Sequence, residues 1–384
     1  MSRKYNIFKL ADGIQIEISS FEFDRGVSEY HLIIQNRDSK LTFDEQMCAL
    51  LKARDNIITN ELERAVVVFE RFFLSDAANQ QQQLERSISH ISDHAVSFIE
   101  QAPLNGTKVA FWAYLQSNVE ISPAKGGLFE VKSGTYKHLW GAGAVSYGTD
   151  SKIQTEHLLN DYSTALRKCG YGLANSCLRT WFFVHNIELN YAGVVEARNK
   201  VFKDNNLTKE THFIASTGIA GRLADSERVV IMDTYAVGGL KESQIHYLYA
   251  PTHLNPTYQY GVSFERGTRI DYGDRRHVLI SGTASIDNKG QIMHPGEIRK
   301  QTARMIENVE VLLKEANCDF TDVTHIIVYL RDCSDYEIVN DIFRSGFPDI
   351  PYLITLASVC RPGWLVEMEC MAIKKQKENS IANF

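Results

Sequence analysis

The stretch Val359–Ala372, "VCRPGWLVEMECMA", is typical of a tight turn followed by a buried strand. Pro362-Gly363 supplies the turn, since proline fixes φ and glycine tolerates the backbone angles that turns demand. In the strand that follows, Glu367 and Glu369 stand two residues apart among apolar neighbours. Alternate residues of a strand share one face, so the sequence predicts two carboxylates on the same side. A buried carboxylate is costly unless it is paired, hydrogen-bonded or protonated, so this pair needs a reason.

The segments before this strand predict an ordered α+β unit. The alternating segment 277–287 predicts a strand, and 294–318 predicts a helix, because Ile298, Met305, Val309 and Leu312 are spaced for one helical face. Further along come a strand, a short helix and two strands, in segments 325–332, 335–347, 352–359 and 364–373. The predicted order is β-α-β-α-β-β, preceded by a hairpin arm.

The same order recurs twice earlier in the chain. The middle copy comprises segments 136–148, 155–171, 177–187, 192–202, 212–221 and 228–237. The first copy is fainter and comprises 29–36, 42–64, 65–76, 96–106 and 107–116, with "NQQQQL" (79–84) expected to be a polar connector. Repeats of this length are whole domains. We therefore predict three tandem domains, 1–120, 121–240 and 241–384, forming an intramolecular trimer with pseudo-threefold symmetry.

Aligning the closing strands of the three copies separates the two carboxylates. Glu369 is matched by Asp233 in the second copy, so an acid there is expected to have an ordinary structural role. Glu367 is matched by the apolar Ile231 and Ala110. Burial and the neighbouring charge of Glu369 would both raise the pKa of Glu367, which makes it a candidate general acid near neutral pH. The competing interpretation is a strand-end Glu paired with a surface cation.

Composition excludes several classes of protein. The 384 residues are 44% hydrophobic with a formal net charge of −6, which is ample for packed cores and does not favour nucleic-acid binding. The first residues lack the apolar core of a signal peptide, and no apolar stretch is long enough to span a bilayer. Seven scattered cysteines without a CxxC pair are typical of reduced thiols. A cytoplasmic location with no membrane or nucleic-acid partner is expected.

No metal or other cofactor is expected. His90 and His94 stand four residues apart on an expected helix, which is a spacing compatible with metal binding. The sequence shows no acid or cysteine partner for them, so we interpret the pair as a solvated helix face.

The third copy resembles a known family. The segments "ISGTASIDNKGQI", "QTARMIENVEVLL", "VYLRD" and "LVEMECMAI" are similar to the RidA (YjgF-type) proteins over roughly residues 264–375. The resemblance implies a trimeric arrangement with active sites at domain interfaces and Glu367 in the active site. Simple RidA proteins deaminate 2-imino or enamino acids and hold the substrate carboxylate with an arginine two residues after a proline. In this chain that position, after Pro351, is Leu353.

A second resemblance spans the middle copy and its junction with the third. The segments "LRTWFFVHNI", "EARNKVF", "ASTGIAG", "YGVSFERG" and "SGTASI" are similar to motifs of the chorismatases, which cleave chorismate and are built on RidA-like domains. The resemblance implies that Glu367 is the catalytic acid. The 3-hydroxybenzoate-forming subgroup carries a cysteine seven residues earlier, which is Cys360 here, and the residue matching Gly267 correlates with the product in that family.

Further site residues follow from that resemblance. Chorismate has two carboxylates, which guanidinium groups bind bidentately. The resemblance implies substrate-binding roles for the arginines Arg179, Arg198 and Arg266 and for Thr217, Gly218 and Gly267. Two alternatives to a chorismatase remain open: a RidA-like deaminase, or a non-catalytic ligand-binding pseudo-trimer. The chain is expected to be a monomer with internal symmetry or to associate further.

Overall fold

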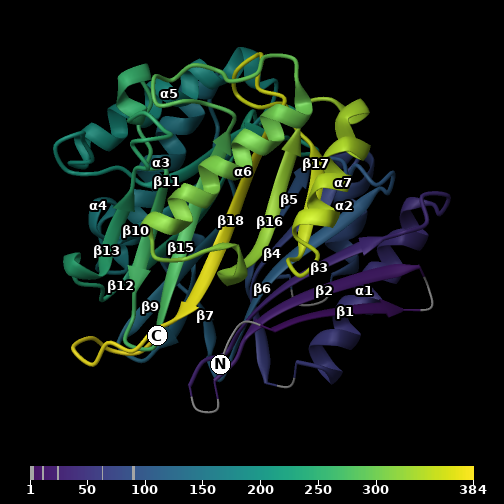
Figure 1. The fold of residues 1–384 in the computed structure, drawn as a ribbon. Coiled ribbons are helices and arrows are strands. Elements are labelled where there is room, and N and C mark those ends of the chain that lie inside the picture. Colours follow the sequence, from purple (N-terminus) through teal and green to yellow (C-terminus); the bar gives the residue numbers. More distant parts are fainter. Residues whose placement is uncertain (1–3, 11–12, 24–25, 63, 89–90) are drawn as a thin grey trace.

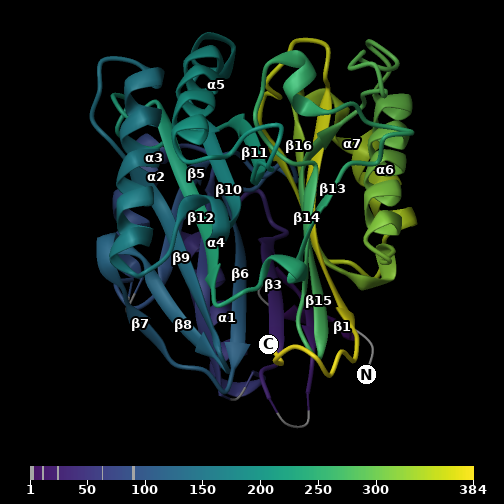
Figure 2. The same cartoon turned by 90° about the vertical axis from the view of Figure 1, so that its left-hand side faces the viewer.

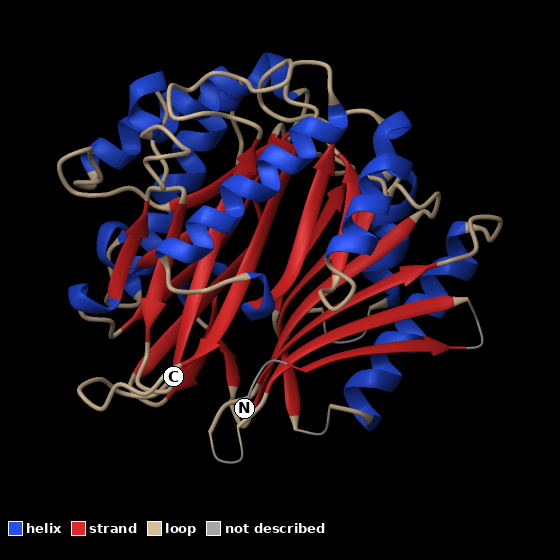
Figure 3. Cartoon of the chain, viewed as in Figure 1, coloured by secondary structure: helices blue, strands red, loops and turns tan. Residues whose placement is uncertain are grey.

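The computed structural model describes residues 4–10, 13–23, 26–62, 64–88 and 91–384, which form three mixed six-stranded sheets in succession along the chain (Figure 1). Helices lie on the outside and strands in the interior (Figure 3). The inward faces of all three sheets share one apolar cluster, which includes Trp112 of the first copy, Trp181 of the second and Tyr329 of the third. The predicted α+β fold of three tandem units is therefore confirmed, and the units form an internal pseudo-trimer.

The third sheet has the strand order β13-β14-β15-β18-β16-β17, with β16 and β17 parallel. Its helices α6 and α7 supply the two crossovers. The elements are β13 Ile245–Leu248, β14 Gly267–Asp271, β15 Arg275–Ala284, α6 Ile298–Glu315, β16 Val323–Leu330, α7 Tyr336–Gly346, β17 Tyr352–Leu356 and β18 Val366–Lys375. The buried residues of α6 include Met305, Val309 and Leu312, the face that the sequence predicts.

The second sheet repeats this plan with the order β11-β10-β12-β9-β8-β7. Its elements are β7 Ile121–Pro123, β8 Phe129–Ser133, β9 Tyr136–Val145, α3 Ser151–Lys168, α4 Leu173–Ser176, β10 Cys177–Val184, α5 Ile187–Asp204, β11 Ala215–Ala220 and β12 Val230–Gly238. The helix α5 packs on β10 and β11. This places Arg198 beside the end of the second copy that meets the third.

The first sheet has the order β1-β2-β3-β6-β4-β5. Its elements are β1 Lys4–Leu10, β2 Ile14–Phe21, β3 Glu29–Asn36, α1 Phe43–Asn60, β4 Ala65–Leu74, α2 Ala77–Ser87, β5 Ala95–Glu100 and β6 Val109–Ser117. No helix in the described ranges is long and apolar enough to cross a membrane.

Strand registers agree with the predicted alignment of the copies. Each closing strand begins with a valine, and its second residue is Glu367 on β18, Ile231 on β12 or Ala110 on β6. These three residues are all buried and pair with Tyr329, Phe183 and Phe73 on the antiparallel neighbour. One copy alone thus places an acid at this internal position.

Two predictions in the first copy are wrong. The "NQQQQL" segment is not a connector but part of α2, where Gln80 and Leu84 face inward four residues apart. Glutamine is a good helix former, and the single leucine hid the periodicity. His94 lies before β5 rather than on a helix face, and its Nε2 is 2.9 Å from the buried Glu70 carboxylate. His90 lies outside the described residues.

Candidate active site

The second and third copies meet along β11. Ile219 of β11 bridges to Val359, and Ala215 bridges to Glu265, so the turn before β18 and the segment before β14 both lie against the second copy. Figure 2 shows β10 and β11 beside the third sheet. This seam brings α5 and β11 to Glu367, although more than 130 residues separate them in sequence.

A small cavity with a volume of about 40 Å³ lies in this seam. The second copy contributes Tyr191, Arg198, Ser216 and Gly218. The third copy contributes the acid Glu367, the turn residues Cys360, Arg361 and Trp364, and residues of β15 and of the segment before β14, including Tyr260, Arg266 and Gly282.

Glu367 is a carboxylic acid with a strongly shifted pKa. Its side chain is 5% exposed, and no ion pair to it is found among the described residues. Burial raises the pKa of Glu367 to about 8, the negative charge of Glu369 adds to this, and Arg179 and Arg266 oppose it. The group is therefore protonated at neutral pH and can donate a proton into the cavity.

Arg198 lies in the cavity wall without a counter-charge. It projects from α5, is 1% exposed, and its Nε and Nη2 have no hydrogen-bond partner. The rings of Phe182 and Phe264 lie 5.9 Å from its guanidinium carbon. No acidic partner for Arg198 occurs in the part of the chain that the structure describes. A buried cation in this state costs free energy that an anionic ligand would recover.

Two further arginines carry unpaired charge at the same cavity. Arg266 donates from Nη2 to the main-chain and side-chain oxygens of Asn255 at 3.0 and 3.1 Å, whereas its Nε has no partner. Arg361 lies over the rings of Tyr260 and Trp364, at 4.5 and 5.2 Å. Together with Arg198 they make a site suited to a molecule with more than one negative charge.

Tyr191 lies next to both Cys360 and Gly218. Burial and the charge of Glu367 raise the pKa of the Cys360 thiol to about 12, and the neighbouring Tyr191 opposes this shift. The thiol is therefore neutral and is not a thiolate nucleophile. A Cβ on Gly218 would stand 2.8 Å from the Tyr191 ring, so glycine gives this ring its place at the cavity.

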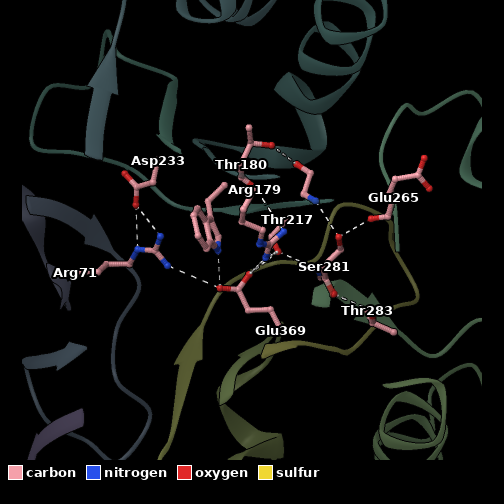
Figure 4. Close-up of polar contacts among 12 residues, drawn as sticks. Arg71, Arg179, Thr180, Thr217, Asp233, Glu265, Ser281, Thr283 and Glu369 are labelled. Carbon is pink, nitrogen blue, oxygen red and sulfur yellow. Dashed lines mark hydrogen bonds and ion pairs between the residues drawn. The ribbon is translucent and has the colours of Figure 1, made fainter. Parts of the chain in front are cut away.

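Three of the predicted site residues do not line the cavity. Gly267 begins β14, where a Cβ would lie 3.0 Å from the Leu279 carbonyl oxygen, so it allows close strand packing. Thr217 and Arg179 point instead toward Glu369 (Figure 4). The geometry does not support direct roles for these three in binding substrate. Arg179 and Thr217 hydrogen-bond to Glu369, and Gly267 packs against the neighbouring strand.

Arg179 is held by Glu369. Its Nη2 donates to Glu369 Oε2 at 2.8 Å, and Trp181 Nε1 donates to Glu369 Oε1 at 2.8 Å. The Thr217 hydroxyl also donates to Glu369. All four side chains are buried. The ordinary structural role expected for Glu369 therefore proves to be a buried ion pair that joins the second and third copies.

The first copy reaches the same cluster through Arg71 on β4. Its guanidinium donates to Asp233 Oδ2 at 2.7 and 3.1 Å, and its Nη1 lies 3.8 Å from Glu369 Oε1 (Figure 4). Arg71, Asp233 and Glu369 thus come from three different copies. We call Arg71, Arg179, Asp233 and Glu369 the axial cluster.

Sequence reasoning missed Arg71, Arg361, Tyr191, Tyr260 and Gly282. Arg71 had a visible signal, since it stands in the apolar strand "AVVVFERFFL". Arg361 follows Cys360 directly but sits in a turn, where a charged residue is unremarkable. The described residues contain no group of three or more His, Cys, Asp or Glu that could hold a metal ion.

Comparison with known proteins places the third copy in a family. The family model described as endoribonuclease L-PSP matches residues 270–374. A RutC family protein of Pyrococcus abyssi is 31% identical over 100 residues, which are 26% of this chain and 79% of that protein. The 2-iminobutanoate/2-iminopropanoate deaminase of Bos taurus is 31% identical over 101 residues, covering 26% of this chain and 74% of the deaminase.

One solved structure resembles most of the chain. A chorismatase crystal structure superimposes with a TM-score of 0.63 at 17% sequence identity, covering 80% of this chain and 92% of that one. At this identity the likeness shows a shared fold. With relatives about one third identical over most of their own length, the chain belongs to the RidA/YjgF family, which includes the RutC proteins.

Proposed function

We propose that the protein is a chorismatase, which removes the enolpyruvyl group of chorismate as pyruvate. The observation that carries this proposal is a carboxylic acid, Glu367, kept protonated at neutral pH beside three arginines that form no ion pair among the described residues. The shared fold with a chorismatase over 80% of the chain supports it.

The reaction needs a proton at carbon. Protonation of the terminal vinyl carbon by Glu367 turns the enol ether into an oxocarbenium-like centre. Attack by water there gives a hemiketal that collapses to pyruvate and a dihydroxycyclohexadiene carboxylate. Attack by a neighbouring hydroxyl of the substrate instead leads to pyruvate plus 3-hydroxybenzoate, with no net uptake of water. A neutral, buried acid suits the first step in both routes.

The cavity also suits the charge of chorismate. The substrate has two carboxylates, and Arg198 and Arg266 approach from opposite copies, with Arg361 at the turn. Guanidinium groups bind carboxylates bidentately, so two arginines can fix both ends of the molecule. Cys360 beside Glu367 favours the 3-hydroxybenzoate route, with its neutral thiol shaping the site.

The deaminase alternative has less support from the geometry. Leu353, at the position of the family's carboxylate-binding arginine, is fully buried on β17. The equivalent positions to Glu367 in the other two copies are Ala110 and Ile231, so neither of those interfaces has an acid there.

We expect the purified protein to release pyruvate from chorismate, measured by coupling to lactate dehydrogenase. Chromatography of the second product will show 3-hydroxybenzoate rather than the dihydroxycyclohexadiene carboxylate. Folded protein that yields no pyruvate above background would contradict the proposal, and ammonia release from 2-iminopropanoate would then favour a deaminase.

The pH profile of kcat/KM should report the pKa of the Glu367 carboxyl. Its protonated form is the active one, and its pKa is raised to about 8, so activity holds through neutral pH and falls as pH rises through this value. The fall above it approaches about tenfold per pH unit. Cys360→Ala should keep this alkaline limb in place, since the thiol pKa is about 12. A profile that already falls between pH 4 and 6 would show an unshifted carboxyl.

A further inference from the structure

The Glu367 carboxyl lies against the backbone of Gly282, which has no side chain. Gly282 lies in β15 where the pairing with β18 shifts register between Ile280 and Thr283. A Cβ on Gly282 would stand 2.2 Å from Glu367 Oε1, so only glycine leaves room for the acid in this position. Bulges re-aim neighbouring side chains and recur beside active sites. The path of the backbone at Gly282 therefore limits where the Glu367 carboxyl can lie.

A hydroxyl of the second copy is one of the groups that hold this bulge, and Ser216 N–H, which donates to Ser281 Oγ at 2.9 Å, is another. The Gly282 N–H donates to Thr217 Oγ1 at 2.9 Å. The same oxygen accepts from Arg179 Nη2 at 2.5 Å, and its proton goes to Glu369. Thr217 is 1% exposed. Its hydroxyl thus makes three interactions and connects the axial cluster to the backbone beneath Glu367.

We propose that Thr217 is a positioning residue, whose hydroxyl fixes the Gly282 bulge and so sets the Glu367 carboxyl relative to the arginines of the cavity. This inference rests on the proposed function. It reassigns Thr217 from substrate contact to a residue that acts through Gly282. The charge and donors that face Thr217 Oγ1 come from β10, β15 and β18, so its geometry depends on both copies.

A nearby threonine provides a matched control. Thr180 Oγ1 donates to Ser216 Oγ at 2.9 Å, and Thr180 is fully buried on β10. Its hydroxyl does not bond Gly282. Thr180→Val therefore removes a buried hydroxyl at the same seam and leaves in place the bond from Gly282 N–H to Thr217 Oγ1.

The test compares Thr217→Val, Thr217→Ser and Thr180→Val. Valine keeps the methyl group and loses the hydroxyl, whereas serine keeps the hydroxyl. Displacing a reacting group by about 1 Å costs about 10²-fold, so we expect Thr217→Val to lose kcat by this factor. KM should stay within about threefold, because the arginines are untouched. Thr217→Ser and Thr180→Val should both stay near the wild-type kcat.

A second readout needs no substrate. The C=O stretch of protonated Glu367, assigned by difference infrared spectroscopy against Glu367→Gln, should shift in Thr217→Val and be unchanged in Thr217→Ser. If Thr217→Val fails to fold, Gly282→Ala should give the same loss of kcat and a shifted band, since its Cβ displaces the carboxyl.

Three results would overturn the inference. Thr217→Val could keep its kcat and infrared band, Thr217→Ser could be as impaired as Thr217→Val, or KM alone could rise, which would show direct substrate contact. If wild-type protein does not turn over chorismate, the proposed function fails, and the infrared comparison still decides whether Thr217 positions Glu367.

Discussion

Replacing Glu367 with glutamine will abolish pyruvate release. Glutamine has nearly the shape of the protonated acid and cannot transfer a proton, so the loss should reach the full contribution of a general acid, about 10²–10⁴-fold in kcat. KM should change little, because the cavity arginines remain in place. The measurement is steady-state kinetics with chorismate at saturating concentration. A variant that retains turnover would move the proton donor elsewhere, with Glu369 as the next candidate.

The thermal stability of the same variant shows whether it is folded. The folded pKa of Glu367 is raised from 4.5 to about 8, so the folded state binds more protons than the unfolded chain between these values. The stability contributed by this group is complete below the lower value and is lost as pH rises through the higher one. Glutamine does not titrate. Glu367→Gln should therefore have a higher melting temperature than the wild-type protein at pH 8, and this difference in melting temperature should vanish near pH 4.

The repeats account for what the sequence could predict. Because the copies share one order of elements, aligning them exposed Glu367 as an acid in an apolar slot, and the buried strand confirms this. Arg198 reaches the cavity because its helix α5 packs on β10 and β11. Arg179 could not be placed in this way. Its partner Glu369 belongs to another copy, and single-chain periodicity carries no information about which copies meet.

The ion pairs that stabilise the interface between the copies could not be predicted from the sequence either. Glu369 appeared ordinary because Asp233 matches it, yet each carboxylate has a different arginine, Arg179 or Arg71. Both acids are buried, so each is tolerated only because its partner is present. The pattern of one copy shows the acid, and only the folded pseudo-trimer shows the cation.

Arg71→Met should destabilise the fold by about 3–5 kcal/mol, because it leaves the fully buried Asp233 without its guanidinium partner. Methionine keeps an unbranched apolar stem at this position, among the rings of Phe69, Trp112, Trp181 and Phe183, which lie 4.8–5.3 Å from the guanidinium carbon. The measurement is the free energy of urea unfolding, followed by tryptophan fluorescence. Arg344→Met is the control, since the exposed Arg344–Asp341 pair should be worth less than about 1 kcal/mol.

A double variant separates charge from packing. Adding Asp233→Asn to Arg71→Met removes the stranded charge, so most of the lost stability should return if the penalty is electrostatic. Gly143 N–H, which donates to Asp233 Oδ1 at 2.6 Å, retains an acceptor in the asparagine oxygen. Among its described residues the first copy contributes none to the cavity, and Arg71 is its link to the axial cluster beside Glu367. If Arg71→Met proves as mild as Arg344→Met, the first copy must hold the assembly through its apolar faces instead.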